Sequence, residues 1–152
     1  DSGVACTYGL FRDCGMPVML REFPIYSDIF DGSSLTAGEP VLEIEDQRYA
    51  TNHARIGARM ARDWALPERM CFAIEHHHDL LFRDDDFLAR ADGGALALIA
   101  MGLCAEQLYS QAIGAAHDEW AQTGEWALFE LGLNEPDFDR LKKRVAQSIG
   151  QL

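Results

Sequence analysis

Apolar residues recur at intervals of three and four along most of the chain, which is the spacing of one face of an α-helix. This pattern predicts helices over residues 3–13, 18–23, 24–30, 39–49, 53–64, 67–78, 93–113, 117–122, 126–131 and 135–149. No segment alternates apolar and polar residues in the manner of a half-buried strand, and no internal repeat is visible. The sequence therefore predicts an all-α fold in which residues 1–152 form a single domain.

Two of these helices carry features that suggest their place in the fold. Residues 96–104 are apolar almost all round, so the helix that contains them is expected to be central and buried. The fifth helix can be capped by Thr51 or Asn52, and its Gly57 would let another helix approach closely. Its predicted inward face consists of His53, Ile56, Met60 and Trp64.

Composition and charge narrow the possible partners. The chain has 152 residues, 48% of them hydrophobic, and 25 acidic against 13 basic residues give a formal net charge of −12. This negative field repels a phosphate backbone, so nucleic acid is not an expected partner. No run of about 18 apolar residues predicts a membrane span, and no basic-then-apolar leader opens the chain. The four scattered cysteines lie in apolar stretches and are expected to be reduced core residues of a cytoplasmic protein.

Three consecutive histidines end the sixth predicted helix. The apolar stripe that passes through Met70 and Ile74 continues to His77 and His78, whereas His76 falls on another side of the helix. Two adjacent inward imidazoles are an unusual end to an apolar face. They require a metal ion, a carboxylate or a buried water as partner.

Imidazole and carboxylate groups also occur on the predicted inward faces of other segments. Helical spacing alone places the following residues inward: Asp13, His53, His77, His78 and Asp92. Mixed imidazole and carboxylate ligation suits zinc, manganese or iron better than calcium or magnesium. An ion held in this way could lower the pKa of a water molecule and polarise a phosphate oxygen, so the spacing suggests a metal site.

Each of these groups also has an ordinary structural interpretation. His53 could be a hydrogen-bonded core residue, Asp13 a local turn acceptor and Asp92 the N-cap of the following helix. His77 and His78 lie near a helix C-terminus, where the helix dipole favours a positive charge. Spacing by itself leaves both interpretations open.

Four segments, taken in order, resemble one protein family. Leu10-Phe-Arg-Asp-Cys-Gly15 is similar to a Leu-Leu-His-Asp-Ile-Gly signature, and Asn52-His53-Ala-Arg-Ile-Gly57 to Asp-His-Ala-Glu-Val-Gly. Trp64-Ala-Leu-Pro67 with Ala73-Ile-Glu-His-His-His-Asp79 is similar to Trp-Gly-Leu-Pro followed by Ala-Ile-x-x-His-His. Leu131-Gly-Leu-Asn-Glu-Pro-Asp-Phe138 is similar to the start of a closing helix. Together these segments resemble the HDOD domain, the bacterial signalling branch of the HD superfamily.

The resemblance implies an HD-domain-like helical bundle. The chain would hold the C-terminal portion of that domain, because the helices that normally precede the first motif are absent. In catalytic relatives a His-Asp doublet, later histidines and a distant aspartate bind metal ions. By position, the doublet falls on Arg12 and Asp13, and the further ligands fall on His53, His77, His78 and Asp92.

Arg12 is the departure from the family pattern, since it replaces the histidine of the doublet. A guanidinium has no lone pair to donate and stays protonated, so it cannot bind a metal and repels one nearby. The Gly-Tyr-Pro motif of the phosphodiesterase branch is also missing after His78. HDOD proteins are regarded as mostly non-catalytic. The expected function is therefore a non-catalytic regulatory module of signal transduction that acts through protein contacts and needs no cofactor.

Two alternatives accompany this expectation. The first is a metal-dependent phosphohydrolase with a reduced, mononuclear site for iron, manganese or zinc. The second is a pocket for a small anionic ligand, because Arg12 is suited to bidentate recognition of phosphate.

Overall fold

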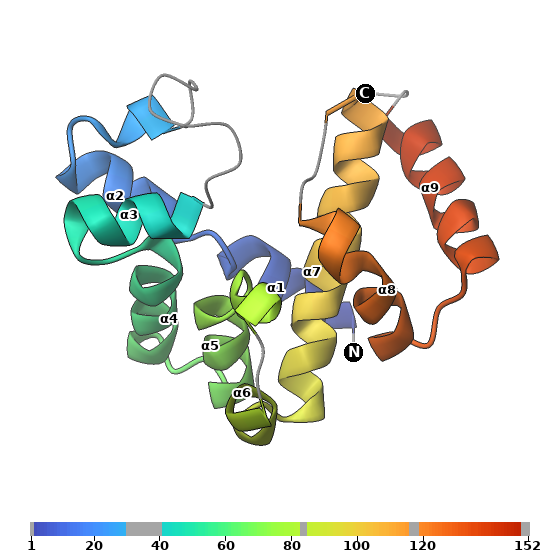
Figure 1. Cartoon of the computed structure of the whole chain (residues 1–152), viewed down its shortest axis with the longest axis horizontal. Coiled ribbons are helices and arrows are strands. Elements are labelled where there is room, and N and C mark those ends of the chain that lie inside the picture. Colours follow the sequence, from blue (N-terminus) through green and yellow to red (C-terminus); the bar gives the residue numbers. More distant parts are fainter. Residues whose placement is uncertain (1, 30–40, 83–84, 116–118, 150–152) are drawn as a thin grey trace. The chain divides into compact units, whose positions relative to one another are not determined.

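The computed structural model describes residues 2–29, 41–82, 85–115 and 119–149, and these residues form helices and no strand (Figure 1). The all-α prediction is confirmed. The chain divides into two compact units, Asp1–His78 and Asp79–Leu152, and the predicted single domain over residues 1–152 stays a prediction. The first unit contains α1 Ser2–Phe11, α2 Met16–Glu22, the 3-10 helix η1 Tyr26–Ile29, α3 Val41–Tyr49, α4 His53–Asp63 and α5 Glu68–Glu75. The second contains η2 Asp79–Phe82, α6 Asp85–Arg90, α7 Gly93–Ile113, α8 Trp120–Glu130 and α9 Glu135–Ile149.

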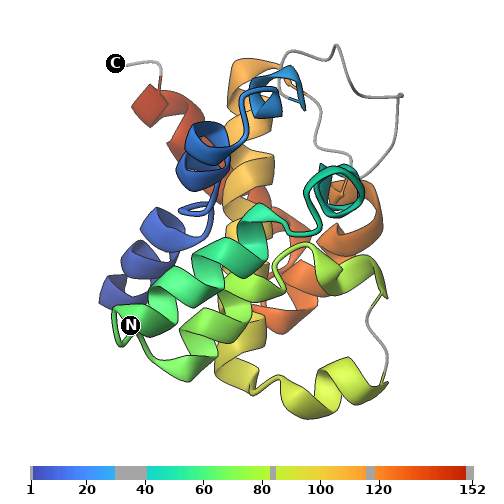
Figure 2. The ribbon, with the colours of Figure 1, turned by 90° about the vertical axis from the view of Figure 1, so that its left-hand side faces the viewer.

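Helices α4 and α5 form the central pair of the first unit and lie side by side (Figure 2). Asn52 caps α4, as predicted, because its side-chain oxygen accepts a hydrogen bond from the backbone N–H of Arg55 at 2.9 Å. Gly57 lets the two helices approach closely, since a Cβ at this position would lie 3.2 Å from Ile74 Cγ2. The small-residue contact predicted for this helix is therefore present.

The inward face of α4 differs from the predicted one. His53 is fully buried, but Trp64 is 53% exposed. The residues that α4 buries are His53, Ala54, Gly57, Ala58 and Ala61. The reason is that α4 uses its small side chains for the closest helix contact, which leaves the large apolar side chains at the border of the contact.

A small apolar cluster holds α3 against the rest of the first unit. Its buried members are Met19, Tyr26 and Ile44, which come from α2, η1 and α3. The rings of Phe23 and Tyr49 stack beside them with centroids 4.3 Å apart. This cluster fixes the distance between α3 and the start of α4, where the candidate site lies.

In the second unit α7 packs against α8 and α9. Its bounds, Gly93–Ile113, agree with the predicted central helix. Asp92 caps its N-terminus by accepting a hydrogen bond from the Ala95 N–H at 2.7 Å, and Gly114 ends it in the left-handed region with φ of 73°. By length and composition α7 could cross a membrane, contrary to the expectation from apolar runs, but core helices pass the same test and 44% of its most apolar window is buried.

The two short helices predicted over 117–122 and 126–131 are wrong in the described part, where one continuous helix, α8, spans Trp120–Glu130. Gly124 does not break it, because the ring of Trp120 covers this glycine and a Cβ would lie 2.6 Å from that ring. Thr123 also supports the helix by donating from its hydroxyl to the Glu119 carbonyl at 2.7 Å. Packing of the Trp120 ring and the Thr123 hydrogen bond thus keep the helix continuous through Gly124.

The cysteines are free thiols, as predicted, but they are not all core residues. Cys71 and Cys104 are buried, Cys14 is partly buried and Cys6 is exposed. Cys6 is exposed because α1 buries only Tyr8 among its described side chains, so a cysteine elsewhere on this short helix remains in solvent.

Candidate functional site

Asp13 lies in the turn between α1 and α2, and backbone packing fixes its position. Gly15, two residues later, lies directly against the start of α4, where a Cβ would be 2.0 Å from the His53 carbonyl oxygen and 2.9 Å from the Gly57 nitrogen. Only glycine permits this approach. The turn is therefore held next to His53, the first residue of α4.

His53 is held in a defined orientation by a carboxylate. Its Nδ1 lies 2.9 and 2.8 Å from the two carboxylate oxygens of Glu45, and its backbone N–H donates to Glu45 Oε2 at 2.9 Å. Both side chains are fully buried. Burial raises the pKa of Glu45, but the hydrogen bonds from His53 and Tyr26 outweigh it and the net pKa is lowered. Glu45 is therefore an anion that accepts the Nδ1–H of His53.

His77 and His78 follow α5 directly. His77 is buried, and its Nδ1 donates to the carbonyl oxygen of Ile74 at 2.7 Å. The rings of His77 and His78 are 4.0 Å apart, and the His53 ring lies 5.4 and 5.3 Å from them. His76 packs instead on Phe72 at 4.3 Å. The expected separation of His76 from the other two histidines is thus present.

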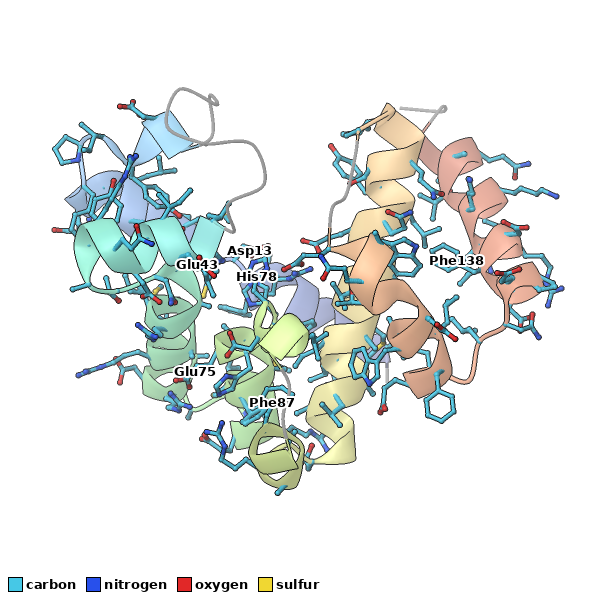
Figure 3. All side chains as sticks on the ribbon, in the orientation of Figure 1. Asp13, Glu43, Glu75, His78, Phe87 and Phe138 are labelled. Carbon is cyan, nitrogen blue, oxygen red and sulfur yellow. The ribbon has the colours of Figure 1, made fainter. Side chains whose placement is uncertain are left out.

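One ligand atom from each of Asp13, His53, His77 and His78 lies within 4.8 Å of the other three. Figure 3 shows the labelled Asp13 and His78 beside each other. Asp13 Oδ1 is 3.3 Å from His77 Nε2 and 3.8 Å from His53 Nε2. Both Nε2 atoms are buried and have no hydrogen-bond partner in the described residues. Two imidazole lone pairs and one carboxylate oxygen therefore converge on a small volume.

The electrostatics favour a neutral His77 and an ionised Asp13. Burial, reinforced by the nearby His78, lowers the pKa of His77 to about 3. Burial alone would raise the pKa of Asp13, but the contact with His77 and the charge of Arg12 outweigh it and lower the pKa to about 2. Neutral imidazole and carboxylate are the forms that bind transition metals.

Arg12 adds a fixed positive charge to this group. Its side chain is 6% exposed, and its Nε lies 3.9 Å from Asp13 Oδ2. This contact is on the carboxylate oxygen of Asp13 that does not face His77. A cation at this distance stabilises the carboxylate and opposes the approach of a second cation.

Asp92 is not part of the four-residue cluster. It belongs to the second unit, where its carboxylate caps α7, so the N-cap interpretation of this residue is the one that the geometry supports. Its assignment as a ligand stays a prediction. Glu45 is the important residue that sequence reasoning missed. A signal existed, because Glu45 lies four residues from both Val41 and Tyr49, which pack on the apolar cluster of the first unit.

A family model described as the HDOD domain matches residues 1–80, which is more than half of the 152 residues. The chain belongs to the HDOD family. The matched segment coincides closely with the first unit, Asp1–His78, and contains the whole four-residue cluster. Comparison with curated proteins and with solved structures gave no match.

Some of the side chains at this site are ligands of the type that bind the metals of catalytic HD relatives. Two buried Nε2 atoms without a hydrogen-bond partner and a carboxylate oxygen are suitable ligands for one divalent ion of the zinc, iron or manganese type. The position of the doublet histidine is taken by Arg12, which supplies no ligand. The described residues of the first unit therefore bring together side chains that could hold one ion, and Arg12 is not among the possible ligands.

Proposed function

We propose that this HDOD chain is a non-catalytic regulatory module of bacterial signal transduction that works through contacts with other proteins. The observation that carries the proposal is the buried guanidinium of Arg12 beside Asp13. By the resemblance to HD proteins, Arg12 stands where catalytic relatives have a metal-binding histidine, and its charge lies beside the carboxylate that an ion would need. The net charge of −12 favours a basic or mixed surface on the partner protein.

A second candidate is a phosphohydrolase with a single metal ion, and the cluster of Asp13 with three histidines favours it. An ion bound there would supply Lewis-acid chemistry and activation of water. His53 and His77 would hold it through Nε2, because their Nδ1 atoms are engaged by Glu45 and by the Ile74 carbonyl. Metal-binding histidines typically donate their other ring N–H to a carboxylate or a carbonyl oxygen in this way.

Metal content and phosphodiester turnover distinguish the two candidates. The measurement compares the wild-type protein with Arg12→His, which restores the family ligand. Arg21→His is the matched control, because Arg21 is exposed on α2 and pairs with the exposed Glu22. Elemental analysis after dialysis against zinc, iron and manganese is the readout.

For a non-catalytic module, the wild type and Arg21→His retain no stoichiometric metal and do not hydrolyse phosphodiesters, and Arg12→His gains an ion. Stoichiometric metal in the wild type together with turnover would overturn the proposal in favour of the phosphohydrolase.

A further inference from the structure

Glu45 of α3 is a fully buried carboxylate with three hydrogen-bond donors around it. The backbone N–H of His53 donates to Oε2 at 2.9 Å, and Nδ1 of the same histidine lies 2.8 and 2.9 Å from the two oxygens. The hydroxyl of Tyr26 donates to Oε1 at 2.5 Å. One buried anion thus joins η1, α3 and the first residue of α4.

An ionised carboxylate can only accept hydrogen bonds, so the proton of a neutral His53 ring belongs on Nδ1. Nε2 then keeps its lone pair. This atom is buried, has no hydrogen-bond partner in the described residues and lies 3.8 Å from Asp13 Oδ1. Glu45 thus binds His53 twice, through the ring Nδ1 and through the backbone N–H.

We propose that Glu45 is a positioning residue that fixes His53 in the Nδ1–H tautomer and so presents the Nε2 lone pair to the cluster of Asp13, His77 and His78. Tyr26 supports this role by holding Oε1, which prevents the carboxylate from rotating away from the ring. The role holds for either candidate function, because it concerns the state of His53 before any ion or partner binds.

A merely structural Glu45 makes a different prediction. If it served only to fill the space between η1, α3 and α4, removing its oxygens at similar volume would leave the tautomer of His53 unchanged. The two cases are distinguished by the nitrogen chemical shifts of the ring, which show whether Nδ1 or Nε2 carries the proton.

The experiment is a long-range proton–nitrogen correlation spectrum of the full chain labelled with ¹⁵N-histidine, at neutral pH and without added metal. His53 is assigned from the spectrum of His53→Gln. Three further variants are compared with the wild type. Glu45→Leu removes the acceptor at similar volume. Glu45→Gln keeps an amide oxygen that can still accept from His53, and Glu43→Gln changes an exposed carboxylate on the same helix.

The wild type, Glu43→Gln and Glu45→Gln are expected to show His53 predominantly as Nδ1–H. In Glu45→Leu the ratio of Nδ1–H to Nε2–H should fall by about tenfold or more, the effect of losing a charge-assisted hydrogen bond. An Nε2–H tautomer of the neutral ring in the wild type would overturn the proposal, even if Glu45→Leu does not fold. An unchanged tautomer ratio in a folded Glu45→Leu protein would also overturn it.

Discussion

The two units of the chain differ in what they bury. In the first unit the described interior contains five polar or charged side chains, Arg12, Glu45, Asn52, His53 and His77, whereas in the second it contains Thr123. The family match covers the first unit and ends at residue 80. The polar interior therefore lies in the part of the chain that defines the family.

This difference shows how each unit obtains its stability. Buried polar groups must find partners at defined distances, so the first unit depends on geometry that tolerates little change. The second unit packs α8 and α9 on an apolar α7, and apolar contacts adapt more easily to substitution. Comparable substitutions should therefore lower the free energy of unfolding more in the first unit than in the second.

Two buried thiols allow the stability of each unit to be measured separately. Cys71 lies in the first unit and Cys104 in the second, and both are buried. Burial raises the pKa of both thiols, that of Cys104 to about 11, so few thiolates exist near neutral pH. Labelling of each cysteine by a thiol reagent therefore reports the opening of its own unit.

The largest contrast is expected between two glycines. Gly15→Ala should destabilise the first unit by about 3 kcal/mol or more, because the new Cβ meets the backbone of α4 at 2.0 Å. Gly124→Ala should change the second unit by about 1 kcal/mol or less. Its Cβ meets the side chain of Trp120 rather than a backbone atom, so a shift of that ring accommodates it, and alanine favours the helix. Labelling rates of Cys71 and Cys104 measure the two effects.

Gly9→Ala is the control for the first unit, because a Cβ at this exposed position on α1 meets no described atom within 4 Å. It should leave Cys71 labelling nearly unchanged. Equal effects of Gly15→Ala and Gly9→Ala would show that the close backbone contact at α4 is not required.

The next contrast concerns buried hydroxyl groups. Tyr26→Phe removes a donor to the buried Glu45 carboxylate and should destabilise the first unit by about 2 kcal/mol. Thr123→Val removes a hydrogen bond to the Glu119 carbonyl and should cost the second unit about 1 kcal/mol or less. Urea unfolding, followed by labelling of the buried thiol in each unit, gives both values. A smaller loss for Tyr26→Phe than for Thr123→Val would contradict the contrast.

The smallest contrast concerns left-handed backbone. In the described residues the first unit places alanines there, at Ala50 and Ala65 with φ of 53° and 58°, and the second unit places glycines, at Gly114 and Gly132. Ala65→Gly should stabilise the first unit by about 0.5 kcal/mol. Glycine relieves the strain of the positive φ, and its greater conformational entropy in the unfolded chain offsets part of that gain. Gly114→Ala should destabilise the second unit by about 1 kcal/mol. The decisive result is a raised melting temperature for Ala65→Gly and a lowered melting temperature for Gly114→Ala.

Much of the fold follows from the sequence, because local signals and tertiary packing agree there. The bounds of α7 and the cap at Asn52 were predicted from periodicity and side-chain chemistry alone. The convergence of Asp13 with His53 and His77 was also predicted, because inward spacing on separate segments brings such groups together. Their role as metal ligands stays a prediction.

The parts that could not be predicted depend on contacts between distant residues. Nothing local to Trp120 or Gly124 shows that the ring will cover the glycine and keep α8 continuous. The small-residue face of α4 depends likewise on its close packing with α5. Spacing indicates that Glu45 shares a face with Val41 and Tyr49, but its partners Tyr26 and His53 come from other elements and cannot be read from the spacing.

Arg12 has a consequence for how the first unit depends on its surroundings. Its guanidinium remains protonated throughout the physiological pH range and is covalently part of the chain, so the positive charge beside Asp13 is a permanent part of the protein. A charge of this kind cannot be removed by a chelator, exchanged for a competing ion or oxidised. Asp13 therefore keeps a counter-charge in a metal-starved cell as well as in a metal-replete one.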